Sequence, residues 1–166
     1  MEPTLRPIRE GDEGRFRALA GEAHVRRFLP EMEMTPRYAE KLAEESRLYA
    51  VFSPCDQMRL FGIYRGEELT GALTLGPSYE AAYQVTVGFF LGSEYLGKGL
   101  ASGAVRKALE IAREAGAPAV FALTDAENTR SIRLLEKVGF REEKRSALRL
   151  YGKREKTAVI LWKYAW

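Results

Sequence analysis

The chain has 166 residues, of which 30% are charged, and a formal net charge of +3 at pH 7. At this length we expect a single domain over residues 1–166, large enough to bury roughly 70% of its unfolded surface without a covalent staple. The single cysteine, Cys55, excludes an internal disulfide and a cysteine metal cluster. We therefore expect a small buried residue at this position, no metal, and a reducing, cytoplasmic setting. No run approaches the about 20 apolar residues that span a membrane, so no membrane partner is expected.

Positive charge gathers near the C-terminus, where residues 141–166 hold eight Lys or Arg and three Glu. Such a section could face nucleic acid or the phosphates of a cofactor. No basic run is interleaved with aromatic residues, as a surface that stacks RNA bases would require. We expect these charged side chains to lie on the solvated face of strands, and we expect no direct nucleic-acid partner.

The first elements along the chain are a short strand and a helix. Residues 5–9 predict the strand, and Asp12 is expected to cap a helix over residues 12–23. Residues 24–34 indicate a connection. Thr35 followed by Pro36 predicts the start of a second helix, which ends near residue 47 and has an apolar stripe of Tyr38, Ala39, Leu42 and Ala43.

The rest of the chain predicts mainly strands. Residues 48–52 are compatible with a helix end or a strand, and a turn is expected over residues 53–56. Further strands are expected over residues 60–65, 69–75, 83–91, 119–123, 141–151 and 156–164, and helices over residues 100–115 and 128–139. This order of elements predicts an α/β fold with a mixed sheet and helices on both faces.

The stretch Val87–Ser102 changes from a continuous apolar run to a helical pattern across two glycines. Gly97 and Gly99 can adopt backbone angles closed to other residues and let a ligand approach the main chain. The following helix leaves its first amide N–H groups without partners and carries roughly half a positive charge at that end. We expect a phosphate or pyrophosphate site formed by Leu96, Gly97, Lys98, Gly99, Leu100, Ala101 and Ser102.

This loop resembles the acyl-CoA pyrophosphate loop of the GNAT superfamily of N-acyltransferases. The family pattern is Gln or Arg, two variable residues, Gly, one variable residue, and Gly or Ala. Gly99 and Ala101 match the pattern, whereas Leu96 stands where the family usually has Gln or Arg. The departure is tolerable because the implied phosphate contacts are mostly backbone amides.

A second segment, Asn128–Phe140, is similar to the GNAT segment in which an Asn opens a helix that Gly and Phe close. Ser131 follows Asn128 by three residues, as is common in the branch of ribosomal-protein N-terminal acetyltransferases, which the chain resembles most. The resemblance implies that Asn128 and Ser131 contact the cofactor. The family often protonates the leaving thiolate with a Tyr seven residues after the Asn, but that position is Leu135. Ser131 is the catalytic replacement that we expect, although it could instead only bind the cofactor or cap the helix.

The resemblance implies the GNAT fold, a central mixed, mostly antiparallel sheet of about seven strands, splayed in the middle, with helices on both faces. In that fold the pantetheine arm of acetyl-CoA enters between the fourth and fifth strands and pairs with the backbone of Phe89, Phe90 and Leu91. The N–H of Phe90 is implied to polarise the thioester carbonyl.

The two N-terminal helices and their connection are implied to form the acceptor-side wall, so Glu31 and Glu33 are candidates for binding the amine. The general base stays open. Glu31, Glu33, Asp125, Glu127 and His24 are candidates, and proton transfer through ordered water is the alternative.

The resemblance implies an acetyl-CoA-dependent N-acetyltransferase that acts by direct transfer on a primary amine, either a protein N-terminus or a small polyamine-like molecule. Homodimers are common among such relatives. One alternative is a GNAT-fold module that holds acyl-CoA without turnover, because the usual Tyr and an obvious base are missing. Another is a mononucleotide phosphate site, which is weakened because no Gly-Lys-Ser or Gly-Lys-Thr triplet is present.

Overall fold

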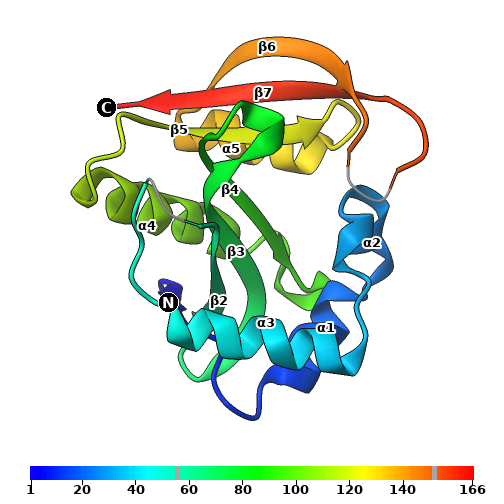
Figure 1. Ribbon diagram of the computed structural model, residues 1–166, viewed down its shortest axis with the longest axis vertical. Coiled ribbons are helices and arrows are strands. Elements are labelled where there is room, and N and C mark those ends of the chain that lie inside the picture. The colour runs from blue at the N-terminus through cyan, green and yellow to red at the C-terminus, as the bar shows by residue number, and fades with distance from the viewer. Residues whose placement is uncertain (55–56, 151–152) are drawn as a thin grey trace.

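The computed structural model describes residues 1–54, 57–150 and 153–166, and is built around a seven-stranded sheet with strand order β1-β2-β3-β4-β5-β7-β6 (Figure 1). Cys55 and the last residue of the expected strand over 141–151 lie outside the described residues. The strands are β1 (Thr4–Arg6), β2 (Arg59–Arg65), β3 (Glu68–Ser78), β4 (Gln84–Leu91), β5 (Ala119–Asp125), β6 (Arg141–Leu148) and β7 (Thr157–Ala165). All neighbouring strands are antiparallel except β4 and β5, which confirms the mixed, mostly antiparallel sheet.

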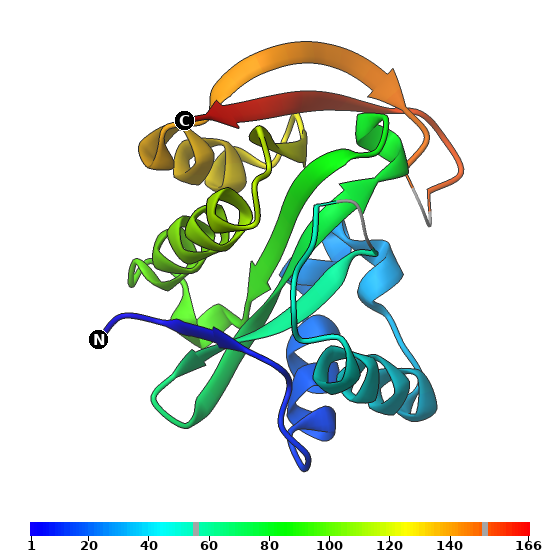
Figure 2. The same ribbon diagram turned by 60° about the vertical axis from the view of Figure 1, so that its left-hand side comes forward.

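Helices cover both faces of the sheet, as expected. The α-helices are α1 (Glu13–Ala20), α2 (Ala23–Phe28), α3 (Pro36–Leu48), α4 (Leu100–Glu114) and α5 (Thr129–Val138), and the short 3-10 turns are η1 (Pro30–Met32), η2 (Tyr79–Ala81) and η3 (Ser93–Tyr95). Helices α4 and α5 lie together on one face, and α1 to α3 lie on the other (Figure 2). On α4, Ala104, Ala108 and Ala112 are completely buried, so this helix packs closely on the sheet.

The N-terminal helical region differs from the prediction in three respects. The helix expected over residues 12–23 ends at Ala20, and the stretch expected as a connection contains α2 and η1. The backbone of Glu22 is extended between the two helices. Asp12 precedes α1 without capping it, because its carboxylate accepts hydrogen bonds from Arg9 and from the hydroxyl of Tyr64. Apolar periodicity could not show these differences, because they involve the C-cap at Gly21 and polar contacts of Asp12.

The start of α3 confirms its predicted cap. The Thr35 hydroxyl accepts a hydrogen bond from the Tyr38 N–H at 3.2 Å, and Pro36 occupies the first turn, where no N–H partner is needed. Ala39 and Ala43 are buried as expected, but Tyr38 is 48% exposed and does not belong to the apolar stripe. The helix continues to Leu48, so residues 48–52 form no strand.

Strand β3 continues through Gly76 and Pro77, where we expected it to end. The pairing of β3 with β4 is unbroken, and alternation along an antiparallel pair turns the Pro77 nitrogen away from β4. Strand β2 pairs with β3 only as far as Leu75, so the missing N–H costs no ladder hydrogen bond.

The sheet is parted between β4 and β5. These strands pair at a single position, Thr86 with Phe121, although they contain eight and seven residues. Beyond this point the C-terminal half of β4 has a neighbour only on its β3 side. The splayed sheet inferred from the family resemblance is therefore confirmed, and it leaves a strand edge in the middle of the molecule that no other described strand covers.

Candidate cofactor and acceptor site

The glycine loop between β4 and α4 has the conformation expected of an anion site. Gly97 and Gly99 have φ angles of 75° and 78°, and no heavy atom lies within 4 Å of the position that a Cβ would take at either residue. The backbone angle, not close packing, therefore requires glycine here. Gly99 precedes the first turn of α4 and supplies no capping side chain. The N-terminal amides of this 15-residue helix thus remain available to an anion.

Two side chains of the loop are engaged with its own backbone. The ammonium of Lys98 donates to the carbonyl of Glu94 at 2.7 Å, and the hydroxyl of Ser102 donates to the carbonyl of Gly99 at 2.9 Å. Both side chains are solvent-accessible, so a phosphate can also reach them.

The open edge of β4 presents the backbone groups of Phe89 and Leu91. The Gly92 N–H donates to the Thr70 carbonyl of β3 at 2.9 Å, and the register between the two strands is unbroken from there to Gln84. Because backbone groups alternate in direction along a strand, the N–H and C=O of Phe90 face β3, whereas those of Phe89 and Leu91 face the gap. The structure therefore presents Phe89 N–H, instead of the expected Phe90 N–H, to a ligand between the strands.

The second motif closes the other side of the gap. Asn128 caps α5, since its side-chain oxygen accepts the Ser131 N–H at 3.3 Å, and Gly139 ends the helix with a φ of 115°, both as predicted. The Ser131 hydroxyl makes no hydrogen bond to another described residue and is half-buried. Leu135, at the position where the family often has Tyr, is completely buried.

Asp125 lies at the end of β5, beside this gap, but its carboxylate is already occupied. It accepts the Glu127 N–H at 2.9 Å and pairs with the Lys153 ammonium at 3.1 Å, and its side chain is only 8% exposed. These contacts hold the turn between β5 and α5, so Asp125 is a poor candidate for a general base.

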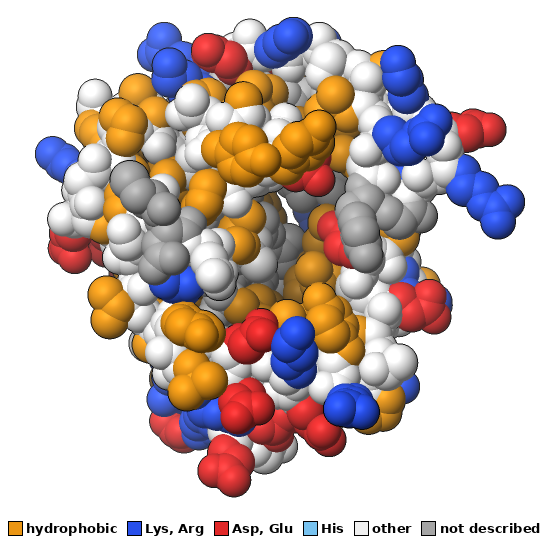
Figure 3. All heavy atoms as spheres, in the orientation of Figure 1, with side chains coloured by type: hydrophobic (Ala, Val, Ile, Leu, Met, Phe, Trp, Pro, Cys, Tyr) orange, Lys and Arg blue, Asp and Glu red, His pale blue; other side chains and the backbone are white. Residues whose placement is uncertain are grey.

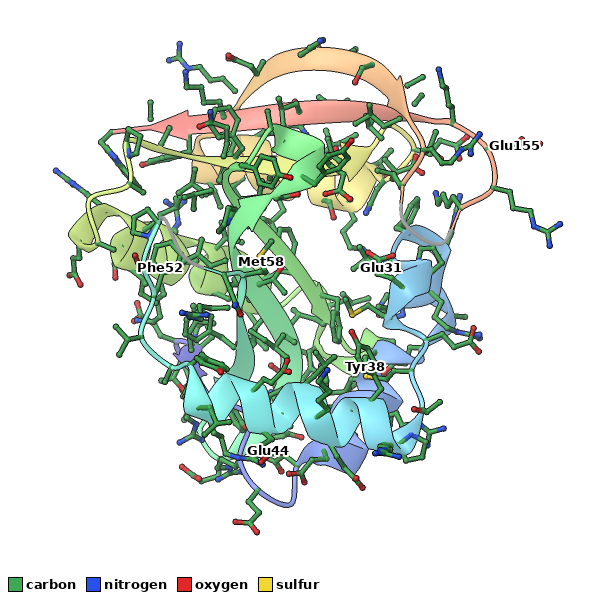
Figure 4. The ribbon with its side chains drawn as sticks, in the orientation of Figure 1. Glu31, Tyr38, Glu44, Phe52, Met58 and Glu155 are labelled. Atoms are coloured by element: carbon green, nitrogen blue, oxygen red, sulfur yellow. The ribbon has the colours of Figure 1, made fainter. Side chains whose placement is uncertain are left out.

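The structure separates the two glutamates expected at the acceptor site. The face in Figure 3 is hollowed at its centre, and Figure 4 shows Glu31 on one side of this hollow and Met58 on the other. Burial raises the pKa of the Glu31 carboxyl above its ordinary value, and the charge of Glu80 raises it further, although Lys153 opposes the shift. Glu33, two residues along the chain, is exposed and pairs with Arg26 at 3.3 Å.

A buried tyrosine that the sequence analysis missed anchors the start of the glycine loop. Tyr95 is 1% exposed, and its hydroxyl donates to Glu68 at 2.6 Å and accepts from Arg15 at 2.5 Å. Arg15 also pairs with Glu94 at 2.7 Å. Burial and the hydrogen bonds with Glu68 and Glu94 raise the pKa of Tyr95 to about 12, so it stays neutral across the working pH range. The only signal in the sequence was an aromatic residue within a polar loop.

We expect Tyr95→Phe to weaken coenzyme A binding several-fold and to lower the free energy of unfolding by about 0.5–1.5 kcal/mol, the net value of a hydrogen bond, since the lost hydroxyl joins Glu68 to Arg15. The Tyr95 hydrogen bond is the largest cause that lowers the pKa of Glu68, so this pKa should rise toward its ordinary value in the variant. NMR titration of Glu68 and calorimetry with coenzyme A measure both effects. An unchanged Glu68 titration would contradict the assigned hydrogen bond.

A parted α/β sheet beside a glycine loop and two helix N-termini defines a protein that holds an extended, phosphate-bearing ligand between two strands. The model of the acetyltransferase (GNAT) domain matches residues 4–141, and the chain belongs to this family. The protein is therefore an acetyltransferase, and acetyl-CoA is the cofactor of such an enzyme. No group of three His, Cys, Asp or Glu among the described residues could hold a metal ion, and none of the described helices is long and apolar enough to cross a bilayer.

Solved structures with the same fold are distant in sequence. A GNAT-family acetyltransferase from Bacillus anthracis is 19% identical, with a TM-score of 0.81, covering 99% of this chain and 95% of that one. A ribosomal L7/L12 alpha-N-protein acetyltransferase in complex with coenzyme A is 16% identical, with a TM-score of 0.80 and coverage of 99% and 94%. Spermidine N-acetyltransferase from Vibrio cholerae, with coenzyme A and spermine, is 17% identical, with a TM-score of 0.77 and coverage of 99% and 95%. No curated protein matches the chain in sequence.

Proposed function

We propose that the protein transfers the acetyl group of acetyl-CoA directly to a primary amine bound in the hollow beside Glu31. The observation that carries this proposal is the parting of β4 from β5 next to the glycine loop. The diphosphate would lie on the amides of residues 97–102, and the pantetheine arm would pair with Phe89 and Leu91 as an added strand. Asn128 and Ser131 would border the cofactor from the N-terminus of α5.

The chemistry needs few side chains, because a thioester is already activated. The neutral amine attacks the carbonyl carbon, the C–N bond forms, and the C–S bond breaks as the negative charge returns from oxygen to sulfur. The Phe89 N–H, which faces the gap, would stabilise the oxyanion. The Ser131 hydroxyl would donate a hydrogen bond to the departing sulfur, and the proton lost by the amine would neutralise the thiolate.

The acceptor is a protein N-terminus or a small polyamine-like amine. Both classes occur among proteins of the same fold, one of which acts on ribosomal L7/L12 and another on spermidine. Glu31 would hold the ammonium form of the amine, since it is a half-buried carboxylate with no ion pair or hydrogen bond to the side chain of another described residue. A carboxyl group with a raised pKa can also accept the proton that the amine must lose.

The direct test mixes the purified protein with acetyl-CoA and a panel of amines that includes spermidine, small diamines and peptides with free N-termini, and follows the release of free thiol. Release that requires both acetyl-CoA and an amine is the expected result. Calorimetry with coenzyme A separates the alternatives. Binding without thiol release from any amine would point to a module that holds acyl-CoA without turnover, and ATP outcompeting coenzyme A would point to a nucleotide site.

Glu31→Gln is expected to lower kcat/KM for a cationic amine about 10- to 100-fold, the range for a lost hydrogen bond to a charged group. In the unaltered enzyme kcat/KM should rise as the pH passes upward through the raised pKa of Glu31, because only the carboxylate attracts an ammonium. The variant should lack this rise. Because the pKa of Glu31 is raised in the folded protein, its ionised carboxylate lowers the free energy of unfolding at pH values above the pKa that it has in the unfolded chain. The variant lacks this cost, so it should be at least as stable as the unaltered enzyme at pH 7.

Glu33→Gln is the matched control, because Glu33 is a nearby carboxylate that is exposed and already paired with Arg26. Its kcat/KM and pH profile should stay close to those of the unaltered enzyme. Equal losses in the two variants would contradict the role assigned to Glu31.

A further inference from the structure

Two side chains at the N-terminal end of α2 hold the C-terminal end of β4. The Glu22 carboxylate accepts the Ser93 N–H at 2.8 Å, and the Nε2 atom of His24 lies 2.9 Å from the Leu91 carbonyl oxygen. The Nδ1 atom of His24 lies 3.4 Å from the same Glu22 carboxylate oxygen. We call Glu22 and His24 the α2 clamp.

The direction of the His24 hydrogen bond follows from its partner. A carbonyl oxygen can only accept, so Nε2 carries the hydrogen and donates it to Leu91. The other ring nitrogen faces Glu22, which orients the imidazole from the opposite side. The His24 side chain is 32% exposed, so solvent or a ligand can reach it where it is bound.

The carbonyl that His24 occupies is one of the groups on the open edge of β4. Alternation along the strand leaves only the backbone groups of Phe89 and Leu91 facing the gap in this half of β4. A ligand that adds to this edge as a strand must donate its own N–H to these carbonyls. The His24 ring already lies 2.9 Å from the Leu91 oxygen, so His24 and a cofactor amide would approach the same acceptor.

We infer that Glu22 and His24 are positioning residues of the cofactor edge, and that bound acyl-CoA displaces His24 from the Leu91 carbonyl. The inference rests on the cofactor edge proposed above. Helix α2 leads directly into η1, which carries Glu31, so this exchange links occupation of the cofactor edge to the wall of the acceptor hollow.

The first test is calorimetry with coenzyme A on the unaltered protein and on His24→Ala and His24→Gln. Removing a competitor for Leu91 should tighten coenzyme A binding in His24→Ala about two- to tenfold, the range for one net hydrogen bond. His24→Gln keeps a donor that can reach a carbonyl, so its affinity should lie nearer that of the unaltered protein. Arg27→Ala, an exposed change on the same helix, is the control and should leave the affinity unchanged.

The second test is NMR of the imidazole nitrogens. The chain has one histidine, so these signals belong to His24 and no variant is needed to assign them. Saturating coenzyme A should shift the Nε2 signal of the unaltered protein away from its hydrogen-bonded position. The inference would be overturned if the unaltered protein bound coenzyme A but His24→Ala bound it no more tightly, or if the imidazole signal did not move. Either result would leave the cofactor site standing. A lack of coenzyme A binding by the unaltered protein would instead refute the proposed function.

Discussion

Replacing Ser102 with aspartate is expected to stabilise the fold and at the same time to weaken coenzyme A binding roughly 10- to 1,000-fold. Ser102 lies in the first turn of α4, and this turn contains no acidic residue. A carboxylate there interacts favourably with the helix dipole, typically by about 0.3–1 kcal/mol. The same carboxylate repels a diphosphate about 4 Å away by roughly 1–4 kcal/mol, depending on how far solvent screens the pair.

The opposite signs of the two effects make this variant informative. Thermal unfolding without ligand should show a higher Tm, and calorimetry should show the weaker Kd for coenzyme A. Ser102→Ala is the matched control, since it removes the hydroxyl that bonds to Gly99 without adding charge. If Ser102→Asp bound coenzyme A as tightly as the control, the diphosphate would not lie at this helix N-terminus.

Gly71→Ala should cost about 3 kcal/mol or more in the free energy of unfolding, the upper range for forcing atoms into a packed site. A Cβ at Gly71 would lie 2.1 Å from the Phe90 carbonyl oxygen and 2.8 Å from the Leu91 Cα. These are backbone atoms of β4, so relief requires the two strands to separate. Since Phe90 lies between the two residues of the open edge, the movement should also weaken coenzyme A binding.

Chemical denaturation measures the stability loss, and Gly14→Ala provides the control. No atom lies within 4 Å of a Cβ at Gly14, which is inside α1 at a φ that other residues adopt. Replacing a glycine with alanine at such a φ should stabilise by about 0.4–1 kcal/mol, chiefly because the unfolded chain loses conformational entropy. A Gly71→Ala protein as stable as the Gly14→Ala protein would mean that β3 and β4 are not packed as closely as described.

Tyr95, Arg15 and Glu68 join three remote segments of the chain at this end of the sheet. The three residues come from η3, α1 and the first position of β3, and they meet directly before the glycine loop. The α2 clamp reaches the same loop from another helix. The glycine loop is therefore held by side chains of α1 and of the N-terminal end of α2, and we expect variants there to alter cofactor affinity without touching the cofactor.

Local chemistry made several parts of the molecule predictable from sequence. The caps at Thr35 and Asn128 and the left-handed residues Gly97, Gly99 and Gly139 follow from residue type and spacing within one or two turns. The strand order along the chain and the loop that suits a phosphate follow from the same short-range patterns. The family resemblance supplied the splay between β4 and β5.

Long-range contacts decided the rest. Whether Phe89 or Phe90 faces the gap depends on the register between β3 and β4, because a shift of one residue exchanges the two faces of a strand edge. The different surroundings of Glu31 and Glu33 involve the η1 turn and Arg26, and Glu22, which lies between α1 and α2, is held by the distant Ser93 N–H. The sequence by itself thus determined most of the helices and strands, the caps at Thr35 and Asn128 and the conformation of the glycine loop. Only the tertiary structure decided which backbone groups and side chains meet at the site, because those contacts join residues that are remote along the chain.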